Sequence, residues 1–154
     1  MVVIGVGVLS ARLLIVSCSA AKKPDEGLLP AIDRYDGVNF QVIRKARRER
    51  YWNLDTHLFI LSAKYGLISE HILIPYYDFR MTLARAQELQ GTVAAQLDRI
   101  SRQVSFSEVF INAGKVYRIA LETSVELPLH QPTYAVGGIG QKMAQMKQWI
   151  ATTT

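Results

Sequence analysis

The chain has 154 residues, of which 49% are hydrophobic and 20% are charged. These values allow one domain with a substantial core, and the sequence has no low-complexity tract that would favour disorder. Lys and Arg outnumber Asp and Glu by five, which suits a polyanionic partner without requiring one. Cys18 is the single cysteine, which excludes an intrachain disulfide and a cysteine-based zinc site within this sequence. The histidines lack metal-ligand spacing, so neither a metal nor another cofactor is predicted.

The apolar N-terminus has features of an export signal but does not form a good one. Residues 15–18, Ile-Val-Ser-Cys, resemble a lipoprotein cleavage box. However, no Lys or Arg precedes the apolar run, and Arg12 interrupts it. The run is also too short and too broken for a membrane-spanning helix. We therefore expect a cytoplasmic protein with no membrane partner, whose N-terminus forms either an edge strand or an extension.

Short apolar segments followed by helical patterns recur along the chain. Buried strands are predicted over residues 13–17, 58–61 and 109–112. Helices are predicted over residues 38–50, 81–104, 115–122 and 139–150. A strand, then a polar turn, then a helix is the pattern of βαβ units in a parallel sheet. With no internal repeat or long linker, we predict a single α/β domain over residues 1–154, with a central, mostly parallel sheet flanked by helices.

Two positions in the predicted helix over residues 81–104 bear on its limits. Thr82 is a candidate N-cap, and Asp78 is the alternative if the helix begins earlier. Gly91 is a candidate break within the helix. The glycines at 137, 138 and 140 precede the last predicted helix and match no P-loop or dinucleotide fingerprint, so we interpret them as a tight turn.

Polar loops follow the three predicted strands and are expected to meet at one edge of the sheet, where ligands of open α/β folds bind. The candidate residues in these loops are Cys18, Ser19, Lys22, Ser62, Lys64, Tyr65, Gly66, Asn112 and Tyr117. Lys22 and Lys64 could contact an anion, act as amine nucleophiles or be solvated surface residues. Cys18 could be a reactive thiol or an inert packed side chain. We interpret this edge of the sheet as the candidate site.

Several residues in and after the second of these loops have more than one interpretation. Tyr65 and Tyr76 could stack on a base or pack in the core. Asp78 could be a general acid or base, a ribose-hydroxyl acceptor or a helix cap, and Arg80 could bind phosphate or pair with Asp78. Gly66 is expected to allow a positive φ or a close backbone approach.

A basic segment precedes the second predicted strand. Its candidate nucleic-acid contacts are Arg44, Lys45, Arg47 and Arg48, and Tyr51 and Trp52 follow them. Such a stripe with nearby aromatic residues could track a phosphate backbone. The alternative is an ordinary solvated helix face.

The order of three motifs resembles the bacterial peroxide-stress YaaA family. An apolar strand ends in Leu61-Ser62 and is followed by Tyr65-Gly66, then Pro75-Tyr76 and Met81, as in that family. The first strand with its Lys-containing turn and the segment 110–112 are similar to the opening and later strands of the family. Cys18-Ser19 followed by a lysine resembles, more weakly, the lyase part of archaeosine synthases, which act on a modified base in tRNA. Both resemblances imply nucleic acid, DNA or RNA, as the partner, and the first implies protection under oxidative stress.

Three functions are compatible with these observations. The first is a nucleic-acid-associated protein with a nucleotide- or base-binding pocket, in stress protection or base modification. If it is an enzyme, its chemistry is expected to be a lyase or glycosidic-bond step, with Lys22, Lys64, Asp78 and Cys18 as catalytic candidates. The second is a non-catalytic DNA- or RNA-binding accessory protein that uses the basic segment. The third is an interaction protein whose pocket is vestigial.

Overall fold

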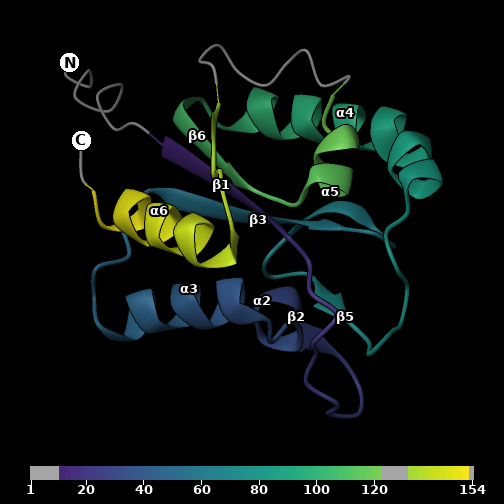
Figure 1. The fold of residues 1–154 in the computed structure, drawn as a ribbon, viewed down its shortest axis with the longest axis horizontal. Helices are drawn as coiled ribbons and strands as arrows, with labels where there is room; N and C mark the ends of the chain where they lie inside the picture. Colours follow the sequence, from purple (N-terminus) through teal and green to yellow (C-terminus); the bar gives the residue numbers. More distant parts are fainter. Residues whose placement is uncertain (1–10, 123–131, 153–154) are drawn as a thin grey trace.

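A computed structural model describes residues 11–122 and 132–152, and its centre is a five-stranded sheet (Figure 1). The strand order is β4-β3-β1-β6-β7. The strands are β1 (Ala11–Ser17), β3 (Thr56–Ser62), β4 (Gly66–Ser69), β6 (Phe106–Asn112) and β7 (Thr133–Tyr134). Strand β1 is parallel to β3 and β6, β7 is parallel to β6, and β4 is antiparallel to β3. The predicted single α/β domain with a mostly parallel sheet is therefore confirmed.

Helices cover both faces of this sheet (Figure 1). They are α2 (Ala31–Arg34), α3 (Val38–Arg48), α4 (Leu83–Gln103), α5 (Lys115–Ile119) and α6 (Ile139–Ala151). Helices α4 and α5 lie on one face, and α3 and α6 lie on the other. Beside α2, β2 (Leu29–Pro30) and β5 (Leu73–Ile74) form a small antiparallel sheet that the sequence did not predict.

The central strand explains why the sheet needs cover on both sides. Leu14 and Val16 of β1 belong to the core cluster that includes α3 and α6. Leu13 and Ile15 belong to the other cluster, which includes α4. All four side chains are fully buried. Because side chains alternate along a strand, a continuous apolar run can be buried only between two helical layers.

The predicted helix boundaries hold with small differences. Thr82 is confirmed as the N-cap of α4, because its Oγ1 accepts a hydrogen bond from the Arg85 amide at 3.1 Å. Gly91 does not break α4, where it is exposed and meets no neighbour, so the helix continues past it. Helix α3 ends before Arg50, which has a left-handed φ of 64° and turns the chain toward β3.

The order of connections defines where a ligand can approach. The chain runs from β1 to β3 on one side of β1 and then returns to β6 on the other side. Helix α3, which comes after β1, lies on one face of the sheet, and α5, which comes after β6, lies on the other. The chain therefore leaves these two neighbouring strands toward opposite faces. In open α/β sheets the crevice at such a switch point is the usual ligand site.

Candidate functional site

Buried hydroxyl groups meet at the carboxyl end of β3. The Tyr77 hydroxyl lies 3.0 Å from Ser62 Oγ at the end of that strand. It also contacts the hydroxyl of Tyr35, the residue that follows α2. Tyr77 is only 6% exposed and Tyr35 is fully buried. We call Tyr35, Ser62 and Tyr77, together with Cys18 and Tyr117 described below, the strand-end cluster.

The three hydroxyls form one connected set of hydrogen bonds. Ser62 Oγ accepts the amide protons of Lys64 and Tyr65, each at 3.1 Å. Its own proton is therefore free to be donated to the Tyr77 oxygen. Tyr35 and Tyr77 then share one hydrogen bond but hold two protons between them. The second phenol proton has the Cys18 sulfur as its acceptor, because the Tyr77 hydroxyl also forms a hydrogen bond with that side chain.

Cys18 and Tyr117 join the loops after β1 and β6. Cys18 is half-buried just beyond β1, and its amide continues the ladder by donating to the carbonyl of Leu61 at 3.0 Å. Its Sγ lies 3.2 Å from the hydroxyl of Tyr117 in α5. This contact spans the switch point between β1 and β6. The expected convergence of the three strand-end loops is therefore observed for Cys18, Ser62 and Tyr117.

Two lysines lie over the ring of Tyr77. Lys22 Nζ is 4.6 Å from the ring centroid, and Lys64 Nζ is 5.4 Å from it. Lys64 Nζ is also 5.4 Å from the ring of Tyr65, which contacts Tyr77 edge to face. An ammonium over an aromatic face is attracted by the ring quadrupole. Two positive charges are thereby held beside the buried phenols, an arrangement suited to an anion.

Backbone contacts hold both lysine loops in place. The backbone of Lys22 forms a β-bridge with Tyr35. The Arg85 guanidinium donates to the carbonyls of Ala63 at 2.8 Å and Lys64 at 2.9 Å. The backbone positions of the two lysines are therefore fixed, while the side chain of Lys64 is exposed and can reach a ligand.

The phenols of the cluster are strongly biased toward their protonated form. Burial raises the pKa of Tyr77 to about 12, with a further contribution from the Cys18 sulfur. Burial likewise raises the pKa of Tyr35 and of Tyr117 well above the ordinary value. At neutral pH these groups donate hydrogen bonds, and none of them can serve as a base.

Several predicted site residues instead have structural contacts. Ser19 Oγ donates to the carbonyl of Ala21 at 2.7 Å and accepts from the amide of Gly37 at 3.1 Å, which closes the first loop. Gly66 has the expected positive φ, +77°, at the start of β4. Asn112 is buried and donates to Asn39 Oδ1 at 3.0 Å, so it links β6 to α3.

The exposed residues on either side of Tyr77 do not join the cluster. Tyr76 is 55% exposed, which excludes the core alternative for its ring. Asp78 and Arg80 are also exposed and have no hydrogen bond or ion pair with another described residue, so the alternative in which Arg80 pairs with Asp78 is not observed. Tyr76 and Asp78 were predicted as substrate-binding and catalytic candidates, but the side chain of this segment that is buried at the strand ends is Tyr77.

Sequence reasoning missed Tyr35 and Tyr77 as site residues. Tyr77 stands beside Tyr76 in the sequence, and adjacent side chains of an extended segment point to opposite sides. Ile74 and Tyr77 are the two buried residues of the stretch 71–80, and their apolar character at that spacing was the available signal. Tyr35 follows a four-residue helix and had no comparable signal.

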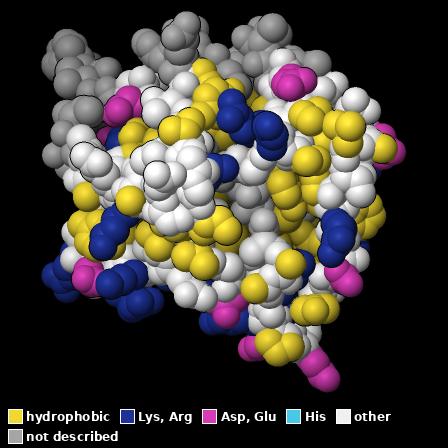
Figure 2. Space-filling view, viewed as in Figure 1, with side chains coloured by type: hydrophobic (Ala, Val, Ile, Leu, Met, Phe, Trp, Pro, Cys, Tyr) yellow, Lys and Arg dark blue, Asp and Glu magenta, His cyan; other side chains and the backbone are white. Residues whose placement is uncertain are grey.

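The basic helix is not a uniform cationic stripe. Arg44 is ion-paired with Asp36 at 2.5 Å and also donates to two backbone carbonyls. Arg47 makes two hydrogen bonds to the Glu70 carboxylate. Lys45 pairs with Glu49, and Arg48 is exposed. Figure 2 shows basic side chains around α3 with acidic ones among them. Two of the four predicted nucleic-acid contacts therefore have their guanidinium groups occupied within the fold.

The described part of the chain holds neither a metal-ligand cluster nor a membrane span. Over residues 11–122 and 132–152, no three or more His, Cys, Asp or Glu side chains are grouped so that they could hold a metal ion. In the same ranges no helix has the length and apolar character needed to cross a bilayer. The expectations for the N-terminal residues 1–10 and for His130 fall outside the described residues.

The fold and the cluster define a class: an open α/β protein with cationic and phenolic side chains at the carboxyl edge of a mostly parallel sheet. More specifically, the chain belongs to the Family of unknown function (DUF6884), whose sequence profile matches residues 13–148. Its structure is similar to the crystal structure of AF0587, a protein of unknown function, with a TM-score of 0.53 and 16% identity. The similarity covers 94% of this chain but 46% of AF0587, so the chain spans less than half of that protein. No curated protein matches the chain.

Proposed function

We propose that the protein binds a nucleotide-like ligand at the strand-end cluster, either free or as part of a nucleic acid. The observation that carries this proposal is the pair of ammonium groups over the Tyr77 ring, at the carboxyl edge of the sheet. Lys22 and Lys64 would contact the phosphate of such a ligand. Tyr65, half-buried beside Lys64, supplies an aromatic surface for a base.

The protonation state of the cluster limits the chemistry that it could perform on such a ligand. Phenols with a raised pKa can donate a proton or a hydrogen bond to a phosphate or leaving-group oxygen. Lys64 and Lys22 remain the candidates for an amine nucleophile, and Cys18 for a thiol. Exposed Asp78 has no contact that ties it to these groups. A role in base processing or stress protection would build on this binding site.

The alternative of a basic-surface nucleic-acid-binding protein receives less support. Arg44 and Arg47 would have to leave internal ion pairs to reach a phosphate backbone. Lys45 has a partner four residues away, which leaves Arg48 as the exposed arginine of the predicted stripe. An interface of this size would make few phosphate contacts and show a shallow salt dependence.

The test is a calorimetric titration with the four common nucleoside monophosphates and the matching nucleosides. Labelled single-stranded DNA and RNA are titrated in parallel at several salt concentrations. Lys64→Met and Lys22→Met should each weaken nucleotide binding about tenfold, because a hydrogen bond to a charged group contributes about 1.5 kcal/mol. Lys147→Met, an exposed lysine of α6, is the matched control and should bind like the wild type.

Two results would contradict the proposal. One is equal binding of nucleosides and nucleotides, which would remove the phosphate from recognition. The other is an equal effect of Lys147→Met and Lys64→Met, which would indicate general attraction to a basic protein. Polymer binding that falls steeply with salt and is unchanged in both Lys22→Met and Lys64→Met would instead favour the basic-surface alternative.

A further inference from the structure

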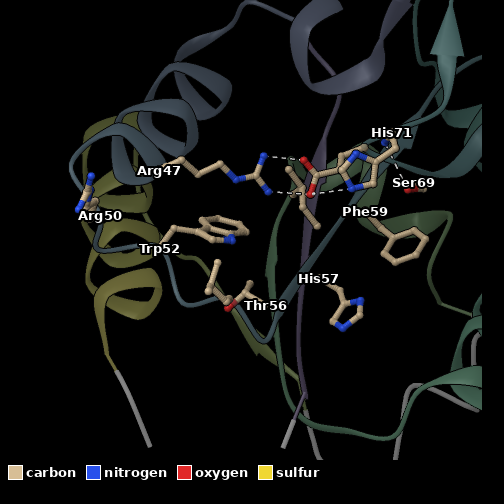
Figure 3. A pocket seen from close by; sticks show the side chains of 11 residues that line it. Arg47, Arg50, Trp52, Thr56, His57, Phe59, Ser69 and His71 are labelled. Atoms are coloured by element: carbon tan, nitrogen blue, oxygen red, sulfur yellow. Dashed lines mark hydrogen bonds and ion pairs between the residues drawn. The ribbon is translucent and has the colours of Figure 1, made fainter.

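A cavity of about 660 Å³ lies at the amino end of β3, the end opposite to the strand-end cluster (Figure 3). Strand β4 pairs with β3 only from Phe59 onward, so residues 56–58 have no neighbouring strand on that side among the described residues. The gap is closed by the end of α3 and by the residues that follow β4. Its volume falls within the range of about 300–1,000 Å³ that is typical of small-molecule sites.

Aromatic side chains form the walls of this cavity. Figure 3 shows Trp52 on one side and His57 and Phe59 on the other. The Arg47 guanidinium lies 4.3 Å from the Trp52 ring, which fixes the indole. His57 is held edge to face against Phe106, with 5.5 Å between the ring centroids. Trp52 packs with the core cluster of α3 and α6, and Phe59 with that of α4, so these rings line the open edge of β3 from its two faces. The walls are ordered before a ligand arrives, and the Trp52 ring can contact a flat group at this edge.

The charge of the lining favours an anion. Arg47 makes hydrogen bonds of 2.5 and 2.7 Å to the two carboxylate oxygens of Glu70, whose side chain is 6% exposed. That pair is neutral as a unit. Arg50, at the rim, is exposed and has no ion-pair partner among the described residues. The lining thus carries one uncompensated positive charge, and Glu70 is its one acidic residue within the described part of the chain.

A buried hydroxyl in the lining has no partner. Thr56 is 7% exposed, and its Oγ1 makes no hydrogen bond with another described residue. Buried hydroxyls in folded proteins nearly always have a hydrogen-bond partner. A polar atom on a ligand would supply one here. The cavity therefore combines aromatic walls, a cationic rim and an unsatisfied polar group on its inner side.

We propose that this cavity is a second binding site, separate from the strand-end cluster, for a small planar aromatic carboxylate. The ring lies against Trp52 at the open edge of β3, on the side of Thr56, and the carboxylate points toward Arg50. This site does not depend on Lys22 or Lys64, so its existence and that of the nucleotide-like site can be tested independently.

The test uses the two tryptophans as reporters in ¹⁵N NMR spectra. Indole-3-acetate and benzoate are titrated into the protein, with benzamide as the neutral counterpart of benzoate. The indole N–H signal of Trp52 should shift, while that of Trp149 in α6, which packs against Arg12, should not. Trp52→Phe assigns the two signals. Lys64→Met should leave the titration unchanged.

Charge recognition is tested with a matched pair of exposed arginines. Arg50→Gln should weaken benzoate binding about three- to fivefold, the effect of one exposed charge, and leave benzamide binding unchanged. Arg48→Gln, an exposed arginine of α3 outside the lining, should have no effect. The proposal is overturned if no probe shifts the Trp52 signal, if benzamide binds as well as benzoate, or if both variants weaken binding equally.

Discussion

Three tyrosines of the strand-end cluster should make the fold sensitive to alkaline pH. Burial raises the pKa of Tyr77 from 10.0 to about 12 and raises the pKa of Tyr35 and of Tyr117 as well. Above pH 10 the unfolded chain ionises these phenols while the folded chain keeps them protonated. The folded state then holds more protons than the unfolded state, so the free energy of unfolding falls as the pH rises.

The size of this effect can be estimated for Tyr77. A rise of its pKa from 10.0 to about 12 corresponds to about 3 kcal/mol, which is fully present below pH 10 and lost by about pH 12. Each phenol that stays protonated only in the fold contributes a slope of about 1.4 kcal/mol per pH unit, so three give about 4 kcal/mol per unit. Because domains are stable by about 5–15 kcal/mol, we expect unfolding near pH 12.

Urea unfolding followed by circular dichroism at pH 8, 10 and 11 measures this slope. Tyr77→Phe should lower the free energy of unfolding at pH 8 by about 1–3 kcal/mol, because Ser62 loses its acceptor. The same variant should reduce the alkaline slope by about a third, since one of three phenols is gone. Tyr76→Phe, which alters the exposed neighbour, should match the wild type in both respects. Equal alkaline slopes for Tyr77→Phe and Tyr76→Phe would refute the reasoning.

Further predictions concern stability at neutral pH. Glu70→Gln should lower the free energy of unfolding by about 2–3 kcal/mol in urea titrations, because it leaves Arg47 without its carboxylate partner. This loss is smaller than the usual cost of breaking a buried ion pair, because the Arg47 side chain is 31% exposed. Gly66→Ala should destabilise the fold by about 1–2 kcal/mol, because φ is +77° and the new Cβ would lie 2.7 Å from Gln96 Oε1. Gly91→Ala should stabilise it by about 0.5–1 kcal/mol in the same assay, because the glycine lies inside α4 with open space around it.

Other residues of the chain provide matched control variants for these predictions. Glu88→Gln alters an exposed ion pair within α4 and should change stability by less than about 1 kcal/mol. A loss as large as that of Glu70→Gln would show that burial of the carboxylate is not the cause. If Gly66→Ala stabilised the fold as Gly91→Ala is expected to, the backbone conformation of Gly66 could not be what requires a glycine there.

The order of strands and helices along the chain was predictable because a strand that is buried on both faces has a continuous apolar sequence. A central strand such as β1 must be apolar at nearly every position, and that run stands out from the charged segments around it. The same run implies parallel pairing, which brings the loops after β1, β3 and β6 to one edge. The pattern of residues alone was therefore enough to place Cys18, Lys22, Lys64 and Tyr117 near one another.

Only the tertiary structure decided which polar side chains in those loops belong together. Tyr76 and Tyr77 are the same residue type, and the direction of the chain after β5 places one in solvent and the other against Tyr35 and Ser62. In the sequence, Arg44 and Arg47 cannot be distinguished from the other basic residues of this segment. The acidic residues that pair with them, Asp36 and Glu70, lie outside α3. Hydrogen bonds and ion pairs between distant residues depend on positions within about an ångström, and a sequence pattern carries no information on that scale.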